Sequence, residues 1–113
     1  MKQSTITIGV QLDEQKVPEN ILWNATDSTA TDSQPAKAMM VSFWDGADKA
    51  ALRIDLWTKE MMVDEMGDFF YQSLMGMADT FDRSTGQHAL AHEMKHFAQD
   101  FFKKFQENLR QQG

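Results

Sequence analysis

The residues best suited to chemistry lie at positions 92–96, where the chain has the sequence His-Glu-Met-Lys-His. This order matches the His-Glu-x-x-His pattern, in which two imidazoles one helical turn apart bind zinc and the glutamate activates a water molecule. His88 comes one turn earlier, so the three histidines of the chain are spaced to fall on one face of a helix. The string by itself predicts a zinc-dependent hydrolase with His92 and His96 as metal ligands.

The helical pattern around these histidines argues against a catalytic centre. When Leu90 is placed at zero on a helical wheel, the apolar stripe is centred at about 20°, whereas the histidines lie at about 160–240°. They share this side with polar and charged residues, which is typical of a solvated surface. Asp100, one turn after His96, offers a third ligand only in a shallow surface site. We therefore predict no catalytic residues and no cofactor, and keep a zinc-dependent hydrolase or metal-binding protein using His92 and His96 as the alternative.

Composition restricts the other classes of function. The 113 residues include no cysteine, which excludes disulfides, thiolate nucleophiles and cysteine-ligated zinc. The formal net charge of −6 is unfavourable for binding nucleic acid. The sequence has no glycine-rich phosphate loop and no nucleophile elbow. Because it also lacks a signal peptide and an apolar run of membrane-helix length, we expect a cytoplasmic protein without membrane insertion.

The first half of the chain has the patterns of strands and turns. Apolar and polar residues alternate over residues 5–12, as in a half-buried strand, and residues 21–23 form a short second apolar run. Residues 24–35 are polar and predict a loop. Residues 45–48, Asp-Gly-Ala-Asp, are a turn signal between two further apolar runs, and so predict a second hairpin.

The strands of this second hairpin can be registered by pairing Asp45 with Asp48. The predicted pairs are then Val41 with Leu52, Met39 with Ile54 and Phe43 with Ala50. In this register the strongest hydrophobes share one face, which we expect to be the core face. The other face holds Met40, Trp44, Arg53, Asp55 and Trp57.

The second half of the chain has a helical period. A first apolar stripe consists of Val63, Met66, Phe70, Leu74, Met77 and Phe81, and a second of Leu90, Met94, Phe97, Phe101 and Phe105. The interruption between them predicts a helical hairpin over residues 62–110.

The order of strands followed by helices predicts an α+β fold. We expect a single domain over residues 1–113, with a four-stranded antiparallel sheet (a meander) over residues 4–57 and the C-terminal two-helix hairpin packed on one face of the sheet. The apolar face is then covered, and the opposite face has no obvious cover.

This opposite face is the best candidate for a binding surface. Met40, Trp44 and Trp57 make it more apolar than a solvated face requires, and Arg53 is a frequent companion of tryptophan in interface anchors. We predict that it binds other proteins, and a homodimer through this face would use the same residues. The alternative is that this face binds no partner, because the polar loop, the chain ends or the twist of the sheet covers its apolar side chains.

Several strings between about Leu12 and Gly86 are distinctive, and the most specific is Arg-Ile-Asp-Leu-Trp-Thr-Lys at residues 53–59. Others are Val17-Pro18-Glu19, Lys37-Ala38-Met39-Met40 and Met77-Ala78-Asp79-Thr80-Phe81. Together they resemble the GldC family of gliding motility proteins. The resemblance implies a small cytoplasmic accessory protein of bacterial gliding motility, not an enzyme, with partners among the other proteins of the gliding machinery. It carries over no active-site residues and does not include the histidine string.

Overall fold

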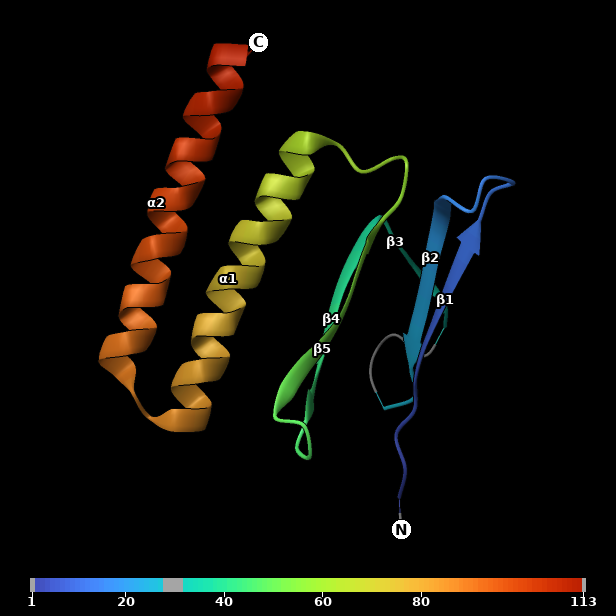
Figure 1. Ribbon diagram of the computed structural model, residues 1–113, viewed down its shortest axis with the longest axis horizontal. Helices are drawn as coiled ribbons and strands as arrows, with labels where there is room; N and C mark the ends of the chain where they lie inside the picture. Colours follow the sequence, from blue (N-terminus) through green and yellow to red (C-terminus); the bar gives the residue numbers. More distant parts are fainter. Residues whose placement is uncertain (1, 28–31, 113) are drawn as a thin grey trace. The chain divides into compact units, whose positions relative to one another are not determined.

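Strands precede helices in the computed structural model, which describes residues 2–27 and 32–112 (Figure 1). The chain divides into two units, Met1–Met61 with the strands and Met62–Gly113 with the helices. The predicted α+β class with two C-terminal helices is confirmed. The predicted single four-stranded sheet is wrong, because the described strands form one three-stranded and one two-stranded antiparallel sheet. Neither of the described helices has the length and apolar character needed to cross a membrane.

The three-stranded sheet has the order β1–β2–β3. Its strands are β1 at Ile6–Leu12, β2 at Pro18–Ala25 and β3 at Gln34–Ala36. Ile21, in the central strand, pairs with Val10 of β1 and Ala36 of β3 and is only 1% exposed. The core of this sheet is therefore centred on Ile21.

β3 was not predicted, because it lies at the end of the segment 24–35 that has the composition of a loop. Residues 28–31 of that segment lie outside the described residues. β3 is too short to show a periodic pattern, and Pro35 within it lacks an N–H group, which is tolerated on an edge strand. β3 occupies the edge of β2 at which the predicted meander placed the strand that begins at Ala38. That strand pairs only with the strand that follows it, so the described strands form two sheets and not one.

The two-stranded sheet is the predicted second hairpin, formed by β4 (Ala38–Asp45) and β5 (Ala50–Trp57). Its register differs by two residues from the predicted one. The observed pairs are Met39 with Leu56, Val41 with Ile54 and Phe43 with Leu52, so the predicted pairs Val41–Leu52, Met39–Ile54 and Phe43–Ala50 are wrong. A shift of two residues keeps every side chain on its predicted face, because side chains alternate with a period of two.

The connecting loop explains this shift. Asp45 Oδ1 accepts hydrogen bonds from the N–H groups of Ala47 (2.9 Å) and Asp48 (3.3 Å), and Lys49 adopts a left-handed φ of 51°. Asp45 therefore caps a loop over residues 46–49 and pairs with Ala50, not with Asp48.

The second unit is the predicted helical hairpin, with α1 at Val63–Thr85 and α2 at His88–Gln112. Near the start of α1, the Met62 N–H donates to the Glu65 carboxylate (3.2 Å), which also complements the positive end of the helix. The helix ends at Gly86, which has a left-handed φ of 70° and donates its N–H to the Asp82 carbonyl (2.8 Å). Gly86 thus sets the reversal between the two helices.

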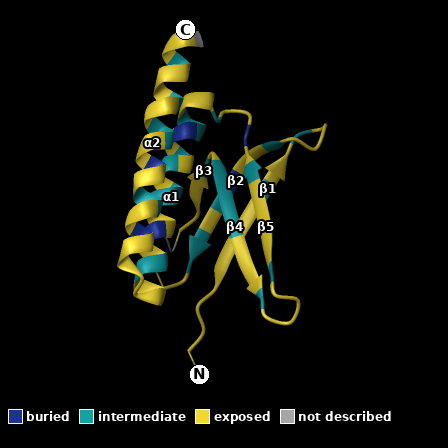
Figure 2. Ribbon diagram, turned by 60° about the vertical axis from the view of Figure 1, so that its left-hand side comes forward, coloured by how far each residue is buried: buried dark blue, intermediate teal, exposed yellow. Residues whose placement is uncertain are grey.

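The two helices meet along faces with small residues. A β-carbon added to Gly67 of α1 would overlap the Phe105 ring of α2, and Tyr71 stacks on Phe102 with ring centroids 4.6 Å apart. The buried positions on these faces are Gly67, Ala78, Ala91 and Ala98 (Figure 2). Members of the predicted stripes, by contrast, are exposed: Val63, Phe70 and Met77 on α1, and Leu90 and Phe97 on α2. Helix packing therefore uses the small residues together with Phe105 of the second stripe, while these five stripe members remain exposed.

Candidate functional site

The four predicted binding residues share one face of the β4–β5 hairpin. The cross-strand pairs on this face, in order along the hairpin, are Ala38–Trp57, Met40–Asp55, Ser42–Arg53 and Trp44–Ala51. Met40 and Arg53 lie beside Asp55 at the centre. The two tryptophans lie at opposite ends, about 20 Å apart along the strands at about 3.4 Å per residue. The structure therefore arranges them as two separate anchors and not as one cluster.

An ion pair occupies the centre of this face. Arg53 donates from Nε to Asp55 Oδ2 (3.1 Å) and from Nη2 to Asp55 Oδ1 (2.9 Å). The hydrogen bonds that Arg53 donates to the Asp55 carboxylate, and secondly the negative charge of Asp55, raise the pKa of Arg53 above its ordinary value. The side chains of Arg53 and Asp55 remain 45% and 44% exposed. The guanidinium is thus held in a fixed plane at the surface, where it remains accessible to a partner.

Apolar surface is exposed on both faces of this hairpin. Trp44 is 68% and Trp57 60% exposed, whereas Met40 is half-buried. On the other face Phe43, Leu52 and Ile54 are also exposed. The apolar excess is therefore not confined to the face that the sequence singled out.

Thr58 fixes the end of the hairpin. Its side chain is buried, and both its N–H (2.8 Å) and its Oγ1 (2.9 Å) donate to the carbonyl of Lys37. Its own carbonyl accepts a hydrogen bond from the Met61 N–H (3.1 Å). Thr58 therefore extends the β4–β5 pairing by one position and sets the path by which the chain leaves the sheet.

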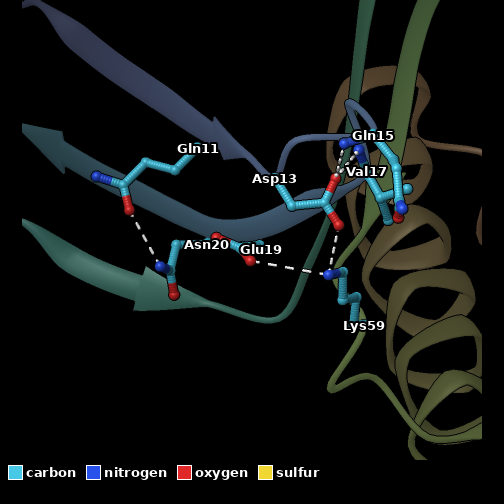
Figure 3. Close-up of polar contacts among 7 residues, drawn as sticks. All are labelled: Gln11, Asp13, Gln15, Val17, Glu19, Asn20 and Lys59. Carbon is cyan, nitrogen blue, oxygen red and sulfur yellow. Dashed lines mark hydrogen bonds and ion pairs between the residues drawn. The ribbon is translucent and has the colours of Figure 1, made fainter.

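Lys59 joins the end of β5 to the turn between β1 and β2 (Figure 3). Its Nζ forms an ion pair with Asp13 and a longer one with Glu19 (3.7 Å). Asp13 also accepts hydrogen bonds at Oδ1 from the N–H groups of Gln15 (2.8 Å) and Val17 (2.9 Å), which shape the turn. The hydrogen bond from Lys59, and then that from Val17, lower the pKa of Asp13, and Asp13 raises the pKa of Lys59. One carboxylate thus organises a turn and anchors a distant lysine.

The Lys59–Asp13 ion pair predicts a pH-dependent stability. A lowered aspartate pKa contributes stability above the ordinary aspartate value, and this is lost as the pH falls through the lowered pKa. A raised lysine pKa contributes stability below the ordinary lysine value, and this is lost as the pH rises through the raised pKa. We therefore expect Lys59→Met to lower the free energy of unfolding between about pH 5 and pH 9, and to have a smaller effect at about pH 2.

Urea unfolding at both pH values, followed by tryptophan fluorescence, checks this difference. Lys2→Met, which alters an exposed lysine near the chain start, is the control and should change the free energy of unfolding little at either pH. An effect of Lys59→Met that is equally large at neutral and acidic pH would assign its contribution to packing of the lysine stem and not to the ion pair.

Comparison with known proteins places these residues in a family. Residues 18–107 match the family described as gliding motility-associated protein GldC-like. The chain belongs to the GldC-like family. No curated protein and no solved structure matches it. The resemblance seen in the sequence is thereby confirmed, and the GldC-like match continues beyond Gly86 through most of α2.

The histidine string lies within the GldC-like match but does not form a metal site in the described chain. His88, His92 and His96 are exposed, and His88 pairs with Asp82. Asp100, the candidate third ligand, pairs with Lys104 (3.0 Å). Across residues 2–27 and 32–112, no three His, Cys, Asp or Glu side chains are grouped so that they could hold a metal ion. The donors of the zinc alternative therefore do not converge.

Lys95, inside the same string, links the two helices. Its Nζ forms an ion pair with Asp79 of α1 (2.6 Å), which lowers the pKa of Asp79 and raises that of Lys95. Lys95 of the histidine string thus connects α2 to α1.

Sequence reasoning missed Thr58, which fixes the end of the β4–β5 hairpin. It also missed the residues that join the two sheets of this GldC-like chain, namely Asp13, Glu19 and Lys59. Thr58 and Lys59 end the most specific string of the resemblance, and this was the available signal. Their partners could not be found in the same way, because no spacing rule pairs a residue after β5 with one in the β1–β2 turn.

Proposed function

We propose that this chain is a non-enzymatic, cytoplasmic accessory protein of bacterial gliding motility that binds another protein of the gliding machinery. Its binding surface is the face of β4–β5 that carries Met40, Trp44, Arg53 and Trp57. Membership of the GldC-like family supports the association with gliding. The observation that carries the binding surface is the exposure of two tryptophans, 68% and 60%, on one face of a hairpin.

The chemistry of this face suits a protein partner. Tryptophan and arginine are the residues that most often dominate the energy of protein interfaces, because they bury a large area and retain a polar handle. Here two indoles flank an Arg53–Asp55 pair whose charges largely balance, so the expected partner surface offers apolar pockets on either side of a polar centre. The net charge of −6 favours such a partner over nucleic acid.

No catalytic role is assigned to the histidine string. His92, Glu93 and His96 are exposed, and Lys95 between them is engaged with Asp79. The polar groups of this helix face are those of a solvated surface, as the helical wheel predicts.

Photo-crosslinking in gliding cells tests the proposed surface. A photoreactive residue at position 44 or 57 should crosslink to one and the same partner protein, whereas the same residue at Ile6, which is 71% exposed on a different sheet, should not. With the crosslinked partner purified, Trp44→Asp and Trp57→Asp should each weaken binding about 30-fold or more, because interface anchors contribute about 2 kcal/mol or more.

The same two substitutions should reduce colony spreading when they replace the chromosomal copy. Circular dichroism and the cellular protein level show whether the fold persists. Normal spreading and unchanged crosslinking by a folded double variant would remove the tryptophan face from consideration.

A further inference from the structure

β5 has one unpaired edge in the described part of the chain. Within residues 2–27 and 32–112 it forms a ladder with β4 and with no other strand. Five consecutive residues of this strand, Ala51 to Asp55, are exposed, including side chains on both faces of the hairpin. An exposed edge presents a row of N–H and C=O groups that can pair with a strand of another chain.

The hydrogen bond made by Thr58 shows which backbone groups point to this edge. Thr58 N–H donates to the Lys37 carbonyl, and residues 37 and 58 continue the register of the β4–β5 pairs. In an antiparallel ladder the residues that bond to the partner strand alternate with those that point away. Ile54 and Leu56 therefore direct their backbone groups toward β4, and Arg53 and Asp55 direct theirs toward the open edge.

We propose that two copies of this chain pair through the open edges of β5, antiparallel, about a two-fold axis at Ile54. In this arrangement the outward-pointing residues of one copy pair with the outward-pointing residues of the other. Such residues are separated by an even number of positions along β5, so the two-fold axis passes through a residue and not between two residues. An axis at Arg53 would place two arginines opposite each other, and an axis at Asp55 would oppose two aspartates. An axis at Ile54 places Arg53 opposite Asp55 of the second copy, twice.

Charge thus selects a single register near the centre of the strand. Opposite charges directly across an antiparallel pair are favourable and like charges are unfavourable. In the selected register Leu52 lies opposite Leu56 of the second copy, and Ile54 lies opposite itself, on the face away from the ion pairs. The exposed apolar side chains of one copy therefore lie next to apolar side chains of the second copy across the two-fold axis.

The resulting sheet has four strands in the order β4–β5–β5–β4. Pairing within one sheet keeps each face on its own side, so the Trp44 and Trp57 side chains of both copies lie on one surface and Phe43, Leu52 and Ile54 of both copies lie on the other. This dimer uses a strand edge and does not rest on the proposed binding of a gliding protein by the tryptophan face.

Charge exchange tests this register. By sedimentation equilibrium the unaltered protein should be a dimer that dissociates on dilution. Arg53→Asp and Asp55→Arg should each raise the dimer dissociation constant about tenfold or more, because each places two like-charge pairs across the axis. The double variant, which exchanges the two charges and keeps the net charge of −6, should return to the original dissociation constant within about threefold. An equimolar mixture of the two single variants should form heterodimers, since each arginine then faces an aspartate.

Disulfide trapping tests the position of the axis, and the absence of cysteine from the chain removes any background. In the proposed register the two copies of Ile54 form a non-hydrogen-bonded pair with Cα atoms about 4.5 Å apart, a separation at which cysteines can bridge. Ile54→Cys should therefore give a covalent dimer under mild oxidation. Leu52→Cys, on the same face and similarly exposed, should not, because its copies are about 14 Å apart.

Three results would overturn the edge-paired dimer: a monomer at every concentration, charge variants that dimerise as the unaltered protein does, or equal crosslinking at positions 52 and 54. Folding of each variant is checked by circular dichroism. Loss of dimerisation in the single charge variants, with recovery in the charge-exchanged variant, would support it, because a general loss of folding would not recover in this way.

Discussion

Replacing Ile21 by alanine is expected to lower the free energy of unfolding of the strand-containing unit by about 2–5 kcal/mol. Ile21 is the largest side chain that is fully buried among the described residues, and it lies in the central strand between Val10 and Ala36. Truncation removes its methyl and methylene groups from the core and leaves a cavity. All three tryptophans lie within Met1–Met61, so urea unfolding followed by tryptophan fluorescence reports on this unit.

Ile6→Ala is the matched control for this substitution. Ile6 has the same side chain in the same three-stranded sheet but is 71% exposed, so its truncation should change the free energy of unfolding by about 0.5 kcal/mol or less. Equal losses for the two variants would show that Ile21 is not the centre of the core.

Replacing Gly67 by alanine is expected to destabilise the helical hairpin by about 1–3 kcal/mol, although alanine is the better helix former. The added β-carbon would overlap the ring of Phe105, so the ring or the helix has to move. Thermal unfolding followed by far-ultraviolet circular dichroism measures the loss, because the signal there is dominated by the two helices.

Gly76 provides the control on the same helix. Apart from the backbone of its own helix, a β-carbon at Gly76 meets no atom within 4 Å, so Gly76→Ala should stabilise the helix by about 0.5–1 kcal/mol through helix propensity alone. Phe105→Leu in the Gly67→Ala background should recover part of the loss, because a smaller side chain makes room. If Gly67→Ala stabilised the protein as Gly76→Ala does, the close approach of the two helices at this position would be refuted.

The strand patterns predicted the faces of the β4–β5 hairpin but not its register. Alternation determines which side chains share a face, and an error of two residues leaves that assignment intact. The register depended on the loop, where Asp45 acts as an acceptor for two backbone N–H groups and not as one member of a cross-strand pair. Turn sequences such as Asp-Gly fit more than one loop length, so local sequence did not determine the choice.

The sheet order could not be predicted, because it depended on β3. A strand of three residues that contains Pro35 has no periodic pattern, yet it fills the edge of β2 and so determines which strands β4 can pair with. The helical elements were predicted well in extent but not in packing. Large hydrophobes mark a stripe on a helical wheel, whereas close approach of two helices needs the small residues Gly67 and Ala78, which carry little hydrophobic signal.

The candidate site was predictable only where it depends on alternation along one hairpin. Met40, Trp44, Arg53 and Trp57 were placed on one face for this reason. The Arg53–Asp55 ion pair follows from the same alternation, since the two residues are neighbours on one face. The contacts of Lys59 with Asp13 and Glu19 join segments far apart in the sequence, and no local rule connects them.

These contacts also bear on the order in which the first unit assembles. Its strand pairings all join elements that are neighbours along the chain, and pairings of this kind form early because each closes a short loop. The ion pair between Lys59 and Asp13 closes a much longer loop, and each of the two hairpins must exist before its residue is in place. We therefore expect the ion pair between Lys59 and Asp13 to form after the two hairpins in folding, and to break before them when the unit opens.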